Sequence, residues 1–200
     1  MSTPNYTLIG AVSTRAARPV WMLEELGVPY EHLGVKPHSD DVVRHYPRGK
    51  VPVLLVEGEP ITDSTAILSY LADAHDQFTA RAGTLARARQ DMLLQCALDE
   101  FDSVLWTSAR HSFILPEDKR VPQVKDSLRW EFERNQASMA RRMGDGPYLT
   151  GENFSIADIV LGHCLLWAKA AKFEITEPAL VEYFDRISER PAYKATMAKR

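Results

Sequence analysis

The hydroxyl-bearing turn Ser13-Thr14 is the first place along the sequence where chemistry could occur. It follows a short apolar run, residues 6–10, and precedes a segment with helical periodicity. A hydroxyl at a helix N-terminus lies beside unpaired backbone N–H groups and the positive end of the helix dipole, which favour an anion. A thiolate held against Ser13 would have a lowered pKa, and the thiolate is the reactive form of a thiol. The alternative is simple helix capping, with Thr14 as the cap and Ser13 as the freer hydroxyl.

A proline preceded by a glycine-lysine pair forms the second candidate segment, Gly49-Lys50-Val51-Pro52. A proline at the mouth of a strand can adopt the cis isomer, which reshapes the backbone just before it. Val51 would then offer its own N–H and C=O to an extended ligand, and Lys50 could meet a carboxylate. The alternative is that Pro52 only begins the strand.

The third candidate segment, Asp63-Ser64, opens an apolar helical run. Asp63 can pair with an ammonium group, while Ser64 and the helix N-terminus can bind a carboxylate. Such a pair would hold the backbone end of an amino acid. Asp and Ser are also the commonest helix caps, so capping alone is the other interpretation.

The elements that must position these residues alternate between strands and helices. Period and composition predict a strand, a helix, a strand, a polar loop, two strands and a helix. These cover residues 6–10, 13–26, 29–33, 36–50, 52–56, 61–62 and 63–74. The order β-α-β, loop, β-β-α predicts a small α/β sandwich of thioredoxin type, although other mixed folds fit the same order.

Strand signals disappear after about Ala80, and helical periodicity follows. We expect helices over residues 85–110, 121–143, 155–172, 178–188 and 192–199. Ser155 and Asp158 have the spacing of a capping box, so Asp158 is expected to fix the start of an apolar central helix and not to be catalytic. The predicted organisation is an α/β domain over residues 1–76, a linker over 77–83 and an all-helical domain over 84–200.

Composition excludes several classes of function. The 200 residues carry 24 Lys+Arg and 27 Asp+Glu, a formal net charge of -3, which argues against nucleic-acid binding. Cys96 and Cys164 form no CxxC motif, so neither a dithiol redox centre nor a thiolate zinc site is expected, and both are expected to be packing residues. The histidines lack ligand spacing, so no metal is expected. With no leader sequence and no long apolar stretch, we expect a cytoplasmic protein without a membrane partner.

Taken together, these segments resemble the glutathione transferase superfamily over nearly the whole chain. The resemblance is carried by Ser13, by residues 21–31, by the Pro-x-Gly-Lys-Val-Pro stretch at 47–54, by residues 61–71, by the capping segment at 149–158 and by residues 189–193. It implies a thioredoxin-like N-terminal domain followed by an all-helical glutathione-transferase C-terminal domain, usually as a homodimer.

The resemblance also implies roles for individual residues. Ser13 matches the hydroxyl that stabilises the glutathione thiolate in serine-type classes. Val51, before a cis-Pro52, matches the residue whose backbone pairs with the cysteinyl part of glutathione. Asp63 and Ser64 match the pair that binds the γ-glutamyl ammonium and carboxylate groups.

Further positions complete the site that the resemblance implies. Lys50 and His38 would lie near the glycyl carboxylate of glutathione. Trp106, Arg110 and Phe113 lie where the family lines its pocket for the electrophile. Glutathione is then a co-substrate and no metal is required.

The function expected from the resemblance is conjugation of the glutathione thiolate to small hydrophobic electrophiles, a detoxification reaction. No Cys occurs in residues 1–76, which argues against the cysteine-type members. The alternatives are a glutathione-dependent isomerase or dehalogenase, or a non-catalytic glutathione-transferase-like binding protein.

Overall fold

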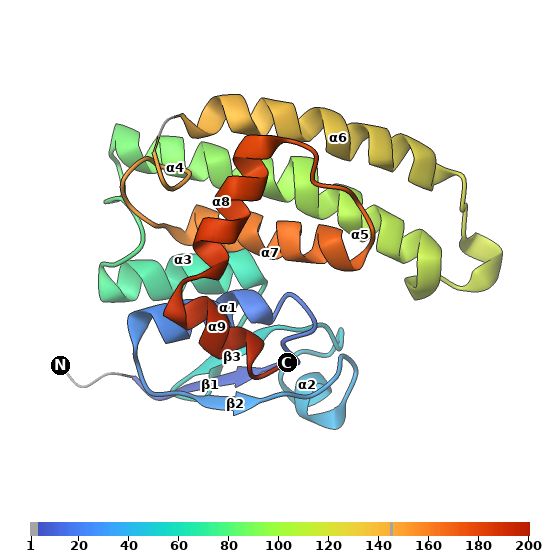
Figure 1. Ribbon diagram of the computed structural model, residues 1–200. Coiled ribbons are helices and arrows are strands. Elements are labelled where there is room, and N and C mark those ends of the chain that lie inside the picture. Colours follow the sequence, from blue (N-terminus) through green and yellow to red (C-terminus); the bar gives the residue numbers. More distant parts are fainter. Residues whose placement is uncertain (1–3, 145) are drawn as a thin grey trace. The chain divides into compact units, whose positions relative to one another are not determined.

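A four-stranded mixed sheet organises the first part of the chain (Figure 1). Its strands are β1 (Tyr6–Ile9), β2 (Glu31–Leu33), β3 (Val53–Val56) and β4 (Glu59–Thr62). The order across the sheet is β2-β1-β3-β4, with β1 parallel to β2, and with β1–β3 and β3–β4 antiparallel. The predicted β-α-β unit followed by a hairpin is therefore confirmed.

The computed structural model describes residues 4–144 and 146–200, which fall into two compact units. The first unit runs to Arg81 and also includes Ser188–Arg200, whereas the second is Ala82–Ile187. The helices of the first unit are α1 (Ala17–Leu26), α2 (Asp40–His45), α3 (Ser64–His75) and α9 (Pro191–Met197). The last residues of the chain therefore belong to the same unit as the sheet, where α9 packs against α1.

Helix α1 begins at Ala17, four residues after Ser13. Pro19 lies in its first turn, where backbone N–H groups have no partner within the helix, so the missing donor is tolerated. Gly27 ends the helix in the left-handed conformation, with φ 63°.

The polar segment at 36–50 was predicted as a loop, and that is wrong for Asp40–His45, which forms α2. The signal was present, because two aspartates lie in the first turn of α2 and two basic residues in its last turn. These charges complement the helix dipole. Val42 holds the helix in place, since it is fully buried against Ile9 and Val53.

The second unit is built from helices, and π-helical segments lie on both sides of one of them. Its α-helices are α4 (Leu85–Cys96), α5 (Ser103–Ala109), α6 (Val124–Met143), α7 (Ile156–Ala170) and α8 (Pro178–Ser188). The π-helical segments η1 (Ala97–Asp102) and η2 (Arg110–Ile114) flank α5, and a short 3-10 turn, η3, covers Glu117–Lys119. Among the described residues, no helix has the length and apolar character needed to cross a lipid bilayer.

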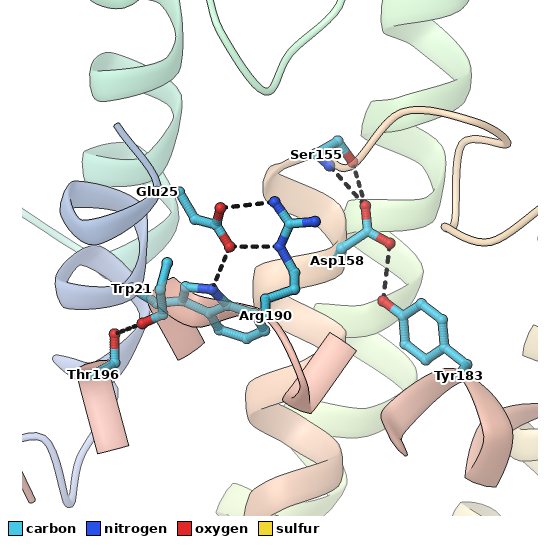
Figure 2. A network of polar contacts seen from close by, with 8 residues as sticks. Trp21, Glu25, Ser155, Asp158, Tyr183, Arg190 and Thr196 are labelled. Carbon is cyan, nitrogen blue, oxygen red and sulfur yellow. Dashed lines mark hydrogen bonds and ion pairs between the residues drawn. The ribbon is translucent and has the colours of Figure 1, made fainter. Parts of the chain in front are cut away.

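The start of α7 is fixed by Asp158, as predicted (Figure 2). One carboxylate oxygen of Asp158 accepts from the Ser155 N–H at 2.8 Å and the Ser155 hydroxyl at 2.9 Å. The other accepts from the Leu149 N–H at 2.8 Å and the Tyr183 hydroxyl at 2.9 Å. Burial raises the pKa of Asp158, while these hydrogen bonds act in the opposite direction. Asp158 is thus a structural residue that joins three segments of the helical unit.

Candidate functional site

The three segments singled out in the sequence meet at one edge of the sheet. Ile9 of β1 pairs with Val53 of β3, which in turn pairs with Thr62 of β4. The turn after β1, the residues before β3 and the residues after β4 therefore lie side by side. The first two are in close contact, because a Cβ at Gly10 would lie 2.9 Å from the Cβ of Val51.

The two hydroxyls of the first turn have different surroundings. The Thr14 hydroxyl donates to the Ala11 carbonyl at 2.7 Å and accepts from the Ala16 N–H at 3.1 Å. The N-cap of α1 is Ala16, without a side-chain cap, so the prediction that Thr14 caps this helix is wrong. Thr14 instead holds the turn that precedes the helix. Ser13 is exposed and makes no hydrogen bond to another described residue, so its hydroxyl is available to a ligand.

The peptide bond between Val51 and Pro52 is cis. Pro52 is buried and Val51 half-buried. Within the described residues, neither the N–H nor the C=O of Val51 takes part in a backbone hydrogen bond. Backbone polar groups that are partly withdrawn from water require partners, so Val51 can receive an extended ligand by strand-like pairing.

Asp63 caps α3 and still retains binding capacity. One oxygen of its carboxylate accepts from the N–H groups of Thr65 at 2.8 Å and Ala66 at 3.1 Å. The other oxygen makes no hydrogen bond to a described residue, and the side chain is exposed. The backbone of Asp63 has φ 73°, which is unusual for a residue with a side chain and is concentrated at functional sites. Capping and ligand binding are therefore compatible at this residue.

A buried arginine that is not among the predicted site residues lies behind Ser64. Arg18 Nη1 donates to the Ser64 hydroxyl oxygen at 3.1 Å, and the two residues are only 1% and 3% exposed. A hydroxyl that accepts one hydrogen bond can still donate another, so Ser64 can donate to a carboxylate in front of this cation. The sequence signal for Arg18 was a charged residue among the apolar residues in the first turns of α1. A guanidinium buried there requires polar partners.

His38 and Lys50 lie where the loop at His38 meets the segment just before Val51. The His38 N–H donates to the Gly49 carbonyl at 2.7 Å. A Cβ at Gly49 would lie 2.2 Å from His38 Nδ1, so the imidazole packs directly on this glycine. Lys50 follows at once in the chain, and both basic side chains are exposed. The loop thus brings together two groups able to meet a carboxylate.

The residues predicted for the electrophile pocket lie in the helical unit. Trp106 is on α5, and Arg110 and Phe113 are on η2. Trp106 and Arg110 are half-buried, whereas Phe113 is 67% exposed. Arg110 Nη2 donates to the Thr107 hydroxyl at 3.4 Å.

The two cysteines differ from each other. Cys164 is buried on α7, in keeping with a packing residue, but Cys96 is only half-buried. Its sulfur accepts from Arg142 Nη1 at 2.9 Å, and the same nitrogen pairs with Glu100 at 2.8 Å. Burial raises the pKa of the Cys96 thiol, although Arg142 acts to lower it. Across the described residues, no group of three or more His, Cys, Asp or Glu side chains could hold a metal ion.

Comparison with known proteins agrees with this arrangement. The chain matches the N-terminal domain of glutathione S-transferases over residues 12–74 and their C-terminal domain over residues 128–195. Glutathione S-transferase GstA of Escherichia coli O157:H7 is 27% identical over 77% of this chain and 75% of its own length. The disulfide-bond oxidoreductase YfcG of Escherichia coli K12 is 28% identical over 80% of this chain and 76% of its own.

Solved structures give the same result. A glutathione transferase from Methylococcus capsulatus has a TM-score of 0.86 and 25% identity, covering 97% of this chain and 98% of its own. A sphingomonad glutathione S-transferase complexed with glutathione has a TM-score of 0.81 and 26% identity, covering 96% and 98%. With both domains matched and the fold shared throughout, the chain belongs to the glutathione transferase superfamily.

Proposed function

We propose that this protein is a glutathione transferase that conjugates the glutathione thiolate to small electrophiles. The observation that carries the proposal is the meeting of Ser13, Val51 and Asp63-Ser64 at one sheet edge. Each of these segments offers polar groups that the fold itself leaves available. Their chemistry suits an extended tripeptide that carries an ammonium group, a carboxylate at each end and a thiol between them.

The tripeptide would lie along this edge with its γ-glutamyl end at α3. The carboxylate of Asp63 binds the ammonium group, and Ser64 donates to the carboxylate, with the buried Arg18 adding positive charge behind it. The backbone of Val51 pairs with the cysteinyl residue.

At the other end of the tripeptide, the glycyl carboxylate meets the basic loop. Lys50 and His38 supply the positive charge there, and Pro52 holds the backbone that precedes β3. The cysteinyl sulfur then lies between these anchors, beside the turn that carries Ser13.

In this proposal Ser13 is neither a base nor a nucleophile. Its O–H donates a hydrogen bond to sulfur, which favours the thiolate over the thiol and lowers the pKa of bound glutathione. The thiol proton passes to solvent. The sulfur attacks an electrophilic carbon, a C–S bond forms, and the leaving group departs with its electron pair.

The test is retention on immobilised glutathione together with conjugation of 1-chloro-2,4-dinitrobenzene, a generic aryl halide. We expect wild-type protein to bind and react, and Ser13→Ala to bind but react about 100-fold more slowly, the usual effect of losing one donor to a developing or stabilised anion. A wild-type protein that neither binds glutathione nor conjugates the halide would overturn the proposal. Retention without conjugation would favour a binding protein.

A second candidate is glutathione-dependent reduction of a small disulfide, supported by the similarity to the oxidoreductase YfcG. With no cysteine in residues 1–76, the attacking sulfur would be that of glutathione. The thiolate would attack one sulfur of the disulfide, forming a mixed disulfide and releasing the other sulfur as a thiolate. Offering hydroxyethyl disulfide in place of the halide separates the two activities.

A further inference from the structure

A histidine on the edge strand β2 reaches the turn that carries Ser13. His32 Nε2 donates to the Gly10 carbonyl at 2.9 Å, joining residues 22 positions apart. A carbonyl can only accept, so Nε2 is the ring nitrogen that carries the proton in this contact. Gly10 is buried and His32 half-buried, so the hydrogen bond is largely withdrawn from water. The imidazole therefore fixes a backbone group one residue beyond the end of β1.

The Gly10 carbonyl depends on this side chain, because within the described chain no backbone N–H donates to it. The Gly10 N–H continues the parallel ladder by donating to the Leu33 carbonyl, and the next donor in that ladder would be the Val35 N–H. The Val35 N–H instead donates to the Leu33 carbonyl at 2.8 Å. Extending the β1–β3 register places Pro52 opposite Gly10, and proline has no N–H to donate. His32 thus supplies the donor that both neighbouring strands lack.

The peptide unit between Gly10 and Ala11 is held at both ends. Its C=O accepts from His32, and its N–H donates to the Val35 carbonyl at 2.9 Å. Gly10 has no Cβ to restrict its backbone, and its φ is 138°, so the orientation of this peptide depends on its hydrogen bonds. The two bonds together fix the plane of the peptide from which the turn begins.

Both groups proposed to meet the cysteinyl part of glutathione lie next to this peptide. Along the chain, the Ala11 carbonyl accepts from the Thr14 N–H at 3.0 Å and from the Thr14 hydroxyl at 2.7 Å, which closes the turn around Ser13. Across the site, a Cβ at Gly10 would lie 2.9 Å from the Cβ of Val51. A rotation of the peptide that follows Gly10 would therefore move Ser13 relative to the Val51 backbone.

We propose that His32 is a positioning residue of the glutathione site, which holds the Ser13 hydroxyl and the Val51 backbone in their relative places through the Gly10 carbonyl. This rests on the proposed transferase function and adds a residue that touches neither the substrates nor the reacting atoms. The imidazole transfers no proton, since its Nε2–H stays on the carbonyl. Removing it should slow the reaction, because a small displacement of a positioned group weakens catalysis.

The experiment replaces His32 by two side chains of similar length that differ in hydrogen bonding. His32→Met removes the donor, whereas His32→Gln retains an N–H for the Gly10 carbonyl. The readouts are the pKa of bound glutathione, from the ultraviolet absorption of the thiolate, and kcat/KM for glutathione with 1-chloro-2,4-dinitrobenzene. We expect His32→Met to return that pKa part of the way to the ordinary value of about 8.5 and to lower kcat/KM by about 3- to 10-fold. His32→Gln should stay close to wild type in both.

His75→Met is the matched control. The His75 Nε2 lies 3.0 Å from the Tyr6 hydroxyl at the other end of β1, so this variant also loses a histidine hydrogen bond within the first unit. Both methionine variants should unfold at lower urea concentration than wild type, but only His32→Met should change the pKa of the bound thiol. If His32→Met does not fold, His32→Asn takes its place, because its amide is one methylene shorter than that of glutamine.

An unchanged thiol pKa in His32→Met, or an equal change in His75→Met, would overturn the positioning role while the transferase function stands. Failure of His32→Gln to keep the lowered pKa would overturn it as well, because the donor to Gly10 is what the role requires. A wild-type protein that binds no glutathione contradicts the proposed function itself.

Discussion

Ser13 and Thr14 both carry a hydroxyl group, but the two hydroxyls differ in their hydrogen bonds. The Thr14 hydroxyl is used within the turn, as donor to Ala11 and acceptor from Ala16. The exposed hydroxyl of Ser13 makes no hydrogen bond to another described residue, and in the proposed function it faces the ligand. At the other side of the site, Ser64 is backed by the buried Arg18. Individual side chains thus divide into those that build the site and those that face its ligand.

Substitution of Gly10 tests the contact between the turn after β1 and the segment before β3. Its φ is 138°, and a Cβ there would lie 2.9 Å from the Cβ atoms of both Ala16 and Val51. We expect Gly10→Ala to lower the free energy of unfolding by about 1–3 kcal/mol, since neither neighbour is the flexible end of a side chain. Affinity for glutathione should fall as well. Urea denaturation and equilibrium binding of glutathione measure the two effects.

Gly34→Ala is the matched control, because the nearest atom to its added Cβ would be at 3.8 Å, an ordinary contact. It should change stability by less than about 0.5 kcal/mol. If Gly10→Ala behaved like Gly34→Ala, the close approach of the turn and Val51 would be refuted.

At the scale of elements, the last helix of the chain supports the first. Arg190, just before α9, makes two hydrogen bonds to the carboxylate of Glu25 on α1, at 2.6 and 2.7 Å. Trp21 Nε1 donates to the same carboxylate at 2.8 Å (Figure 2). The Trp21 ring also meets that of Tyr193 edge-on, with 4.9 Å between the ring centroids. Helix α1 also carries Arg18, so the docking of α9 holds an element of the candidate site.

Removing Arg190 should loosen this docking. The side chains of Arg190 and Glu25 are 22% and 7% exposed, so Arg190→Met would leave a largely buried carboxylate with fewer donors. We expect a loss of about 2–3 kcal/mol in the free energy of unfolding, because breaking a buried pair strands its partner. The control is Lys194→Met. The side chains of Lys194 and its partner Glu189 are 57% and 75% exposed. That change should cost less than about 0.5 kcal/mol, and equal effects in urea denaturation would contradict the supporting role of α9.

How far the sequence predicts an element depends on how local its determinants are. The start of α7 was predicted because Ser155 and Asp158 lie three residues apart and bond to each other. Helix α2 was missed because it has only six residues, in which two adjacent valines give no apolar periodicity, and its anchor Val42 acts through the tertiary core. The pairing of Glu25 with Arg190 joins residues 165 positions apart, which no local pattern reveals.

The residues of the candidate site also differ in how local their determinants are. Ser13, Val51 and Asp63 could be singled out because each lies at the end of an element with a recognisable motif. Arg18 was not singled out, because a lone charged residue in the first turns of a helix is a weak signal and its role depends on burial against Ser64 of another helix. The π-helical turn at Arg110 likewise has no local sequence signature, and only the folded backbone reveals it.

At the scale of the whole molecule, each unit has its own core. In the first unit, Leu8 and Leu54 of the sheet are fully buried together with Leu71 of α3. In the second, Phe132 packs edge-on between Phe101 and Phe173, at 5.4 Å from each. Both cores bury tyrosines whose hydroxyls are held in the neutral form.

Stability should therefore fall at alkaline pH. Burial raises the pKa of Tyr6 to about 12 and, with Glu24, raises that of Tyr30 further. Burial also raises the pKa of Tyr193, and of Tyr183 in the second unit, where Asp158 adds to the effect. The unfolded chain loses these protons near pH 10. The contribution of these tyrosines to the free energy of unfolding is therefore fully present below pH 10 and is lost as pH rises toward about 12.

The measurement is urea denaturation from pH 8 to 11.5. We expect a constant free energy of unfolding up to about pH 10 and a decline above it. Tyr6→Phe removes one of the shifted groups and should make the decline shallower. A free energy that stays level to the end of the range would show that these hydroxyls ionise alike in the folded and unfolded chain.

The proposed function depends most on ionisation of the glutathione thiol beside Ser13. The direct measurement is a pH titration of bound glutathione, followed by the ultraviolet absorption of the thiolate, in wild type, Ser13→Ala and Ser13→Thr. The prediction is a bound thiol with a pKa below the ordinary value of about 8.5, a return toward that value in Ser13→Ala and partial retention in Ser13→Thr. Ser69→Ala, which removes the same group from α3, should titrate like wild type. An ordinary pKa in the wild-type complex, or an unchanged lowered pKa in Ser13→Ala, would contradict the role assigned to Ser13.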